Sequence, residues 1–380
     1  MTQAKSRKQS FDRLTDEGLA ELRSEIGTEI IGPPGFITEA TRDGIRHFAL
    51  GIGDENPLWL DEDYAAKSPH GGLLAPPFIL FAMNRTAWGA RGLRGIHSMF
   101  SGAYFEWHRN IRLGDRLTSK TTLKDIEVKQ ESKFAGRTIK QIREVTFRDS
   151  AGEVVAVSRP YSFRMERDAA SEKGKYGKLT RAHYTPDEYA RIAAEYDQEV
   201  RRGNSPRYWQ DVEIGENLPH VVKGPLTVTD IIVWLLGFGG QWLRAHGDAV
   251  RWYRRHPKGG ILNSFGAFEP PEIVHWDDDL ARRVGVPAAY DYGPQRMSWL
   301  GHLMTNWMGD HGFLRNMDAQ VRRFNLVGDT TWCRGKVAEK WREGRNHLVR
   351  CEIWAEDQRG EVTAKGTATV ELPSKGTQGG

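Results

Sequence analysis

The sequence predicts an α+β protein in which one unit, a buried helix followed by an antiparallel meander, occurs twice and forms one continuous sheet. Residues 54–65 (DENPLWLDEDYA) return as residues 269–281 (EPPEIVHWDDDLA), with Trp59 and His275 at corresponding positions. Each copy precedes a stretch that is apolar on nearly every side, which is typical of a fully buried helix. Alternating segments rich in β-branched residues follow, and these predict strands.

In the first half, two amphipathic helices are expected before the buried one. Apolar residues at helical spacing predict helices that begin near Thr15 and Thr41. Residues 73–89 (LLAPPFILFAMNRTAWG) are predicted to form the long buried helix, with Pro76 and Pro77 in its first turn, where a missing N–H costs nothing. The predicted strands are Ala103–Trp107, Arg116–Glu127, Thr138–Arg148 and Glu153–Met165.

A polar linker follows, and the second half then repeats this order. Thr227–Leu236 corresponds to the early helix, with Asp230 matching Asp43, and Tyr292–Asp310 corresponds to the buried helix. The spacing between matched positions changes along the two copies, which predicts an insertion at about residues 240–268. The expected organisation is an extension (1–30), a first unit (31–166), a linker with one helix (167–205), a second unit (206–374) and a tail (375–380).

Composition narrows the class of protein. A chain of 380 residues suits two domains, and a net charge of +4 suits a phosphate-bearing ligand. No recognised nucleic-acid motif accompanies that charge, so we expect no nucleic-acid partner. No secretory signal, long apolar run or metal-binding spacing around the two cysteines is visible. These features predict a cytoplasmic protein without a membrane segment, disulfide or metal.

The two related segments resemble a known family. DENPLWLDEDYA followed by APPFIL resembles the N-terminal half of MaoC-type acyl dehydratases, a half similar to the FAS1-like dehydratase domain, and VHWDDDLA with the later YGPQRM resembles the catalytic half. The resemblance covers about residues 31–372. It implies a tandem (double) hot-dog fold, with two long central helices each wrapped by an antiparallel sheet. It also implies R-specific hydration of a trans-2-enoyl-CoA, or the reverse dehydration, with coenzyme A as part of the substrate and no other cofactor.

Position by position, the resemblance assigns the catalytic histidine to His275 and the helix-start glycine, whose N–H would face the thioester oxygen, to Gly293. This chain departs from the family pattern at two places. The catalytic aspartate of the second half is replaced by Pro270, and the histidine of the first half is replaced by Trp59. Neither copy therefore contains the complete Asp–His pair.

Hydration of a conjugated thioester requires a base for water, an acid for Cα and a dipole at the carbonyl oxygen. His275 suits the first role, because histidine has a pKa near working pH, and a helix start at Gly293 suits the third. Glu272 or Glu269 could supply the missing carboxylate, with Glu272 slightly favoured because it lies three residues before His275. Without the repeat, a histidine in this context would more often be a structural residue.

Further residues are expected to contact the substrate. They are Asp54, Asn56 and Trp59 of the first copy and Trp276 and Asp277 of the second. The insertion carries Arg251, Arg254 and Arg255 among aromatic rings, which could bind the phosphates and base of coenzyme A. A solvated lid or an oligomer contact is the alternative reading of that insertion.

Three functions remain open from the sequence. The first is an enoyl-CoA hydratase or 3-hydroxyacyl-CoA dehydratase, for a bulky or aromatic acyl group given the thirteen tryptophans. The second is a hot-dog thioesterase, with Asp54 or Glu272 as nucleophile or base. The third is a non-catalytic acyl-CoA-binding subunit. The expected partners are an acyl-CoA thioester and either a second copy of the chain or a related hot-dog subunit.

Overall fold

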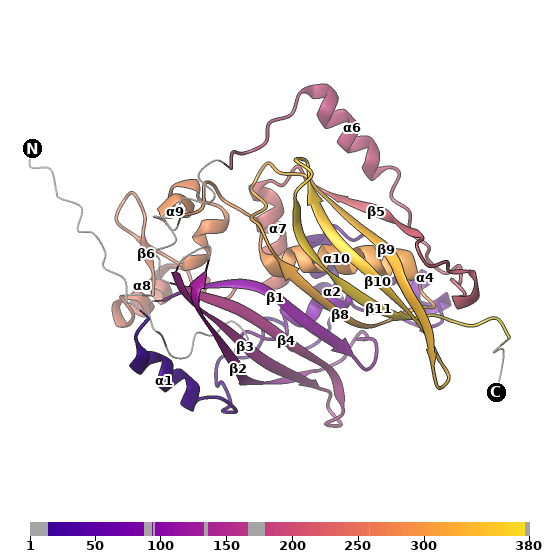
Figure 1. The fold of residues 1–380 in the computed structure, drawn as a ribbon, viewed down its shortest axis with the longest axis horizontal. Coiled ribbons are helices and arrows are strands. Elements are labelled where there is room, and N and C mark those ends of the chain that lie inside the picture. Colours follow the sequence, from indigo (N-terminus) through magenta and orange to yellow (C-terminus); the bar gives the residue numbers. More distant parts are fainter. Residues whose placement is uncertain are drawn as a thin grey trace, which may run out of the picture.

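The computed structural model describes residues 14–86, 93, 96–132, 136–165, 179–257, 259–283 and 285–376. Its main feature is one antiparallel sheet of nine strands in the order β2-β3-β4-β1-β8-β11-β10-β9-β5 (Figure 1). The first half contributes β1 (His97–Trp107), β2 (Thr118–Ser132), β3 (Gly136–Arg148) and β4 (Val154–Met165). The second half contributes β5 (Asn217–Lys223), β8 (Phe313–Val321), β9 (Thr331–Glu343), β10 (Asn346–Asp357) and β11 (Val362–Glu371).

The two halves join through β1 and β8, which pair antiparallel from Gly102 opposite Gln320 to Glu106 opposite Asn316. Gly102 is required at this junction, because a Cβ atom there would lie 2.4 Å from the carbonyl oxygen of Ala319. The prediction that the two meanders form one continuous sheet is therefore confirmed.

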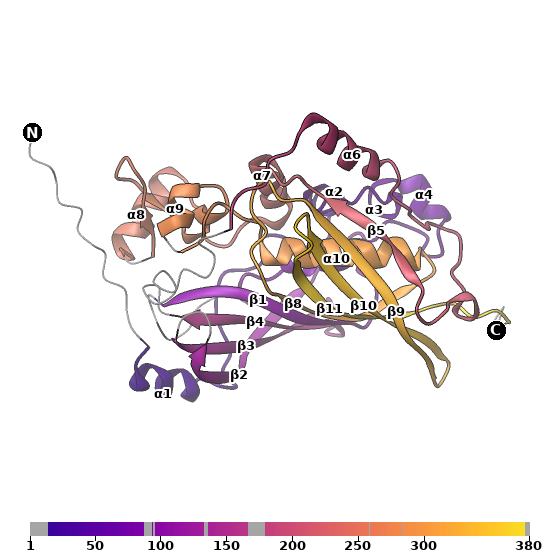
Figure 2. The same cartoon turned by 45° about the horizontal axis from the view of Figure 1, so that its top comes forward.

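The second half contains the long central helix predicted for it. Helix α10 (Gly293–Met308) lies against the concave face of the sheet (Figure 2), and every residue from Pro294 to Met308 is buried. In the first half, the described part of the predicted helix is a short 3₁₀ turn, η1 (Pro77–Phe81), and residues 87–89 of the prediction lie outside the described residues. Pro76 is the N-cap of this turn and Pro77 is its first residue, where a missing N–H costs nothing.

Helices α2 (Arg42–Gly51) and α7 (Val228–Phe238) reveal the symmetry of the two halves. A Cβ atom on Gly51 would lie 3.2 Å from Trp234 Cα, and one on Gly237 would lie 2.6 Å from Phe48 Cα, so each glycine admits the other helix. These reciprocal contacts make Gly51 and Gly237 equivalent positions. The expected match of Asp43 with Asp230 is therefore wrong by one position, because Thr229 is the equivalent of Asp43.

Shorter elements complete the chain. The first half also contains α1 (Asp16–Ser24), α3 (Pro57–Leu60) and α4 (Glu62–Lys67). The linker carries the predicted helix, α6 (Pro186–Tyr196), which begins with a capping box formed by Thr185 and Glu188. The short 3₁₀ turn η3 (Trp209–Asp211) follows it. Beyond α7 lie α8 (His246–Arg255), the small hairpin β6 (Ile261–Leu262) and β7 (Phe268–Glu269), η4 (Pro271–His275) and α9 (Asp278–Arg283). Within the described ranges, no helix is long and apolar enough to cross a bilayer.

Candidate active site

The carboxylate of Glu272 occupies the place that symmetry gives to an aspartate. Gly240 follows Gly237 at the same spacing at which Asp54 follows Gly51, so Gly240 is the equivalent of Asp54. A Cβ atom on Gly240 would lie 3.1 Å from Glu272 Oε2. Glu272 belongs to η4, which follows the insertion in the sequence, and its side chain is one methylene longer than that of an aspartate. The second copy of the site thus has a carboxylate, although no aspartate stands at the corresponding position in the sequence.

Backbone N–H groups hold the two carboxylates in the same way. Oε1 of Glu272 accepts hydrogen bonds from the N–H groups of Gln241 (2.6 Å) and Trp242 (3.2 Å). In the first copy, Oδ1 of Asp54 accepts from the N–H of Asn56 at 3.1 Å, and Asn56 is the symmetry mate of Trp242. The two loops therefore present equivalent anion-binding backbones.

Glu272 is held as a proton-carrying group. Its side chain is 6% exposed, and burial raises its pKa to about 7, although the backbone N–H groups of Gln241 and Trp242 and the charge of Arg85 oppose the rise. Oε2 has no hydrogen-bond partner among the described residues. A buried carboxyl with one uncommitted oxygen and a pKa near neutrality can donate or accept a proton under working conditions.

His275 ends η4 and lies between two tyrosines. Its Nδ1 is 2.8 Å from the carbonyl oxygen of Tyr290, so Nδ1 carries the proton and Nε2 keeps a lone pair. The ring stacks on Tyr292, with centroids 3.7 Å apart, and meets Tyr290 edge-on at 4.6 Å. His275 as a residue is half-buried, but burial of its imidazole lowers its pKa to about 4, although hydrogen bonds with the backbone of Tyr290 and Asp291 oppose this. His275 is therefore neutral and available as a base.

Tyr292 connects the two groups, and the sequence reading did not single it out. Its ring covers His275, while its buried hydroxyl lies near Glu272, whose charge adds to the effect of burial and raises the pKa of Tyr292 further. The hydroxyl and the Glu272 carboxyl interact directly, which lowers the pKa of Glu272 and raises that of Tyr292, although neither the hydroxyl nor Oε2 has a partner with full hydrogen-bond geometry among the described residues. The sequence signal that could have identified Tyr292 is its place directly before Gly293, the glycine of the family pattern.

The start of α10 is fixed directly behind this group. Asp291 and Arg296 form an ion pair with side chains about 1% exposed or less, and Arg296 Nη1 also donates to the carbonyls of Arg323 (2.7 Å) and Thr363 (3.0 Å). Gly293 is required at the helix start, because a Cβ atom there would lie 2.3 Å from Phe100 Cδ1. Phe100 belongs to β1, so the first half forms part of this wall.

The first copy of the site is filled by a different network. Trp59 Nε1 donates to Asp54 Oδ2 at 2.9 Å, and His302 of α10 places Nε2 at 3.4 Å from Asp54 Oδ1. Lys223 Nζ donates to His302 Nδ1 (2.9 Å) and to the carbonyl of Gly53 (2.7 Å). The side chains of Asp54, Trp59 and His302 are at most 4% exposed. Asp54 is therefore committed to internal partners.

Glu199 of the linker completes that network. Its Oε1 lies 3.1 Å from His302 Nε2 and accepts from Asn306 Nδ2 at 2.9 Å. Burial alone would raise the pKa of Glu199, but the hydrogen bond and charge of His302 and the charge of Lys223 lower it to about 2. Burial lowers the pKa of Lys223, and the charges of Glu199 and Asp54 oppose this. His302 therefore contacts residues of all three parts of the chain: Glu199 of the linker, Asp54 of the first half and Lys223 of the second half.

The remaining candidate residues have other local partners. Glu269 accepts from Asn263 Nδ2 at 3.0 Å within the small hairpin, and Asp277 Oδ1 accepts from the N–H of Leu280 at 2.8 Å. Asn56 Oδ1 accepts from the N–H of Leu58 at 3.0 Å and begins α3, while Trp276 packs between two core clusters. The side chains on α8 that are exposed include Arg251, Arg254 and Arg255.

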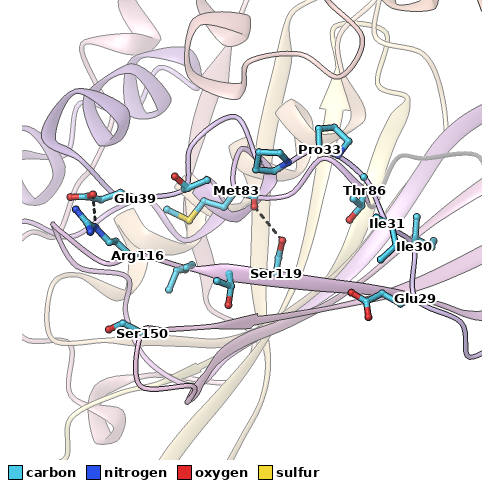
Figure 3. Close-up of a pocket in the computed structure, with 16 residues that line it drawn as sticks. Glu29, Ile30, Ile31, Pro33, Glu39, Met83, Thr86, Arg116, Ser119 and Ser150 are labelled. Carbon is cyan, nitrogen blue, oxygen red and sulfur yellow. Dashed lines mark hydrogen bonds and ion pairs between the residues drawn. The ribbon is translucent and has the colours of Figure 1, made fainter.

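A separate cavity of about 630 Å³ lies at the edge of β2 (Figure 3). Residues 29–39 bridge to β2 at Glu29–Thr122 and to the segment just before β2 at Glu39–Arg116, and residues 32–35 (GPPG) lie between these two bridges. Its charged groups are already paired, with Arg116 Nε 2.8 Å from Glu39 and Lys120 Nζ 3.3 Å from Glu29. It therefore supplies no free catalytic group.

Comparison with known proteins agrees with this architecture. Residues 24–158 match the family model of the FAS1-like dehydratase domain region. A UPF0336 protein of Streptomyces coelicolor is 33% identical over 132 residues, which are 33% of this chain and 84% of that protein. A probable enoyl-CoA hydratase alpha subunit of Thermomonospora curvata is 28% identical over 134 residues, which are 30% of this chain and 41% of that protein. A solved MaoC-like dehydratase superposes with a TM-score of 0.66 at 19% identity, over 93% of this chain and 100% of that one.

Fold and site together define a tandem hot-dog protein in which Glu272 and His275 lie in the second copy of the site, while the first copy is filled by internal hydrogen bonds. The chain belongs to the MaoC-like hot-dog dehydratase family.

Proposed function

We propose that this chain is an enoyl-CoA hydratase or 3-hydroxyacyl-CoA dehydratase whose reaction takes place at Glu272 and His275. The observation that carries the proposal is the position of Glu272: its carboxyl replaces the missing aspartate, is buried, and keeps Oε2 uncommitted beside the histidine segment. Family membership supports the reaction class, and the geometry supports the choice of residues.

In hydration, Nε2 of His275 takes a proton from water while the water oxygen bonds to Cβ of the enoyl thioester. The electron pair of the double bond moves to Cα, where the carboxyl of Glu272 delivers its proton. The backbone N–H at Gly293, at the positive end of α10, would stabilise the charge that develops on the thioester oxygen. Dehydration is the reverse, with the proton on His275 and the charge on Glu272.

The pKa values of the two groups suit this division of roles. His275, with a pKa of about 4, is neutral at working pH, and Glu272, with a pKa of about 7, is largely protonated below neutrality. Hydration should therefore fall off below about pH 4 and above about pH 7. A protonated carboxyl is a poor nucleophile, so the same observation favours hydration over thioester hydrolysis by Glu272.

The test is incubation of the full chain with crotonyl-CoA and with longer and aryl enoyl-CoA thioesters. Loss of the conjugated-thioester absorbance without release of free thiol supports the proposal. Release of thiol would indicate a thioesterase, and no change with any substrate would indicate a non-catalytic acyl-CoA-binding protein. His275→Ala should lower turnover at least about a hundredfold, the low end for a general base. Near-normal turnover in that variant would remove His275 from the mechanism.

The arginines of α8 supply the substrate-binding part of the proposal. Arg254 and Arg255 are exposed in the last turn of the helix, beside the half-buried ring of Trp252. Such a surface can bind the phosphates of coenzyme A. Arg254→Ala/Arg255→Ala should raise KM for the CoA thioester more than it changes kcat. An unchanged KM would assign this face another role.

A further inference from the structure

Arg85 belongs to the first half, yet its guanidinium reaches the loop of the second half that holds Glu272. Nη2 of Arg85 donates to the carbonyl oxygen of Gln241 at 2.6 Å, and the N–H of Gln241 donates to Glu272 Oε1 at 2.6 Å. We infer that Arg85 is a positioning residue that holds the Gln241 loop under Glu272 and controls the protonation of that carboxyl from the opposite half. Its catalytic meaning rests on the proposed function of Glu272.

The arrangement is reciprocal between the halves. Lys223 of the second half donates to the carbonyl of Gly53, which precedes Asp54, at 2.7 Å. Each of the two carboxylate-binding loops is thus held through a backbone carbonyl by a cation from the other half. In the first half the carboxylate oxygens of Asp54 are occupied by Asn56 and Trp59. Glu272 Oε2 has no such partner among the described residues, so only the loop held by Arg85 presents a carboxyl that can react.

The charge of Arg85 opposes the effect of burial on Glu272. Burial favours the neutral carboxyl, while a nearby cation favours the carboxylate. Arg85 is half-buried, its Nε has no partner within the described chain, and its charge lowers the pKa that burial raises. Removal of this cation should therefore keep Glu272 protonated to a higher pH. A purely structural arginine would change stability without moving this titration.

The first experiment follows the pH dependence of hydration in Arg85→Gln. We expect the upper limb of kcat/KM to move upward by about one to two pH units, the size for a unit charge roughly 6–12 Å away at an effective dielectric constant of about 20. Arg85→Lys keeps the charge and should leave the limb close to that of the wild type. Arg207→Gln is the matched control, because Arg207 Nε also donates to a backbone carbonyl, that of Trp307, at 2.8 Å.

The second experiment needs no catalytic activity. Infrared difference spectra of the wild type and Glu272→Gln identify the carboxyl band of Glu272, whose titration is then followed in Arg85→Gln. Arg85→Met, which keeps an apolar stem, replaces that variant if it fails to fold. An unmoved titration in a folded neutral variant overturns the inference, even if the wild type hydrates enoyl-CoA. A moved titration in a protein inactive on every enoyl thioester would overturn the proposed function and support the control of Glu272 by Arg85.

Discussion

Glu272 Oε2 lies 3.1 Å from the point where a side chain on Gly240 would begin, and Leu243 lies beside it at 2.7 Å, at the position that is equivalent to Asp54 of the first half. In the second half, the backbone position equivalent to Asp54 is Gly240, while the carboxyl is carried by Glu272 on the other side of the insertion in the sequence. A reaction that depends on the carboxyl, and not on the residue that carries it, should tolerate the acid at either position.

Relocation of the acid tests this equivalence. Glu272→Ala should lower hydration at least about a hundredfold, since it removes the general acid. Adding Gly240→Asp should restore about tenfold once the side chain of Leu243, 2.7 Å from the new Cβ, has shifted, because aspartate tolerates the positive φ of +62° at this position better than most residues. Gly240→Asn/Glu272→Ala is the control of equal shape, and recovery there would show that a carboxyl is not what the site requires.

The buried carboxyl should also leave a mark on stability. The pKa of Glu272 is about 7 in the folded protein, above the 4.5 of an ordinary exposed glutamate, so the folded state binds this proton more tightly than the unfolded state does. That contribution to stability is fully present below pH 4.5 and is lost as the pH rises through 7. In urea unfolding, Glu272→Gln should gain stability relative to the wild type between pH 5 and pH 8. Glu269→Gln, in the same segment, should show no such gain; an equal gain would assign the effect to net charge.

The linker contact at Glu199 should behave in the opposite sense. The pKa of Glu199 is about 2 in the folded protein, below the 4.5 of an ordinary exposed glutamate. Its contribution to the free energy of unfolding is therefore present above pH 4.5 and is lost as the pH falls through 2. Glu199→Gln should lower the free energy of unfolding at pH 7 by about 1–3 kcal/mol, the usual loss when buried partners are left unpaired. This loss is measured by thermal unfolding of Glu199→Gln, with Asp197→Asn, which changes an exposed acid of the same linker, as the control. Equal melting temperatures would show that the linker is not held here.

Restoring the family histidine in the first half should not create a second active site. Trp59→His can keep a donor for Asp54, but it replaces a ring that is 4% exposed with a smaller one. The cavity should cost about 2–4 kcal/mol of stability, while turnover per folded molecule stays unchanged. The residual turnover of His275→Ala is the baseline for this test. A double variant Trp59→His/His275→Ala that regains turnover would show that the first copy is accessible to substrate.

The sequence predicted the fold because both of its signals are local. Periodicity along residues 293–308 identifies the buried helix, and the return of residues 54–65 as residues 269–281 identifies the repeat. The same alignment led to Glu272 as a replacement for the aspartate, which the contacts with Gln241 and Trp242 support. The long helix expected over residues 73–89 is instead a 3₁₀ turn at Pro77–Phe81, although the apolar pattern and the prolines at its start suit an α-helix equally well.

The residues missed by the sequence reading all act across large separations. Arg85 of the first half contacts the loop at Gln241, and Glu199 and Lys223 meet His302 from the linker and from an edge strand. Nothing in the local pattern around Lys223 distinguishes it from a solvated strand lysine. The buried contacts of His302 place it in the network around Asp54. Such assignments depend on the symmetry of the folded halves and not on spacing.

Two phenylalanines of the first half lie directly on glycines of α10: Phe100 covers Gly293, and Phe78 covers Gly301, where a Cβ atom would approach to 2.5 Å. The first half therefore shapes the surface of the central helix of the second half. A chain of the second half alone would lack the two rings that cover Gly293 and Gly301. The two halves thus depend on each other for the packing of α10 as well as for the shared sheet.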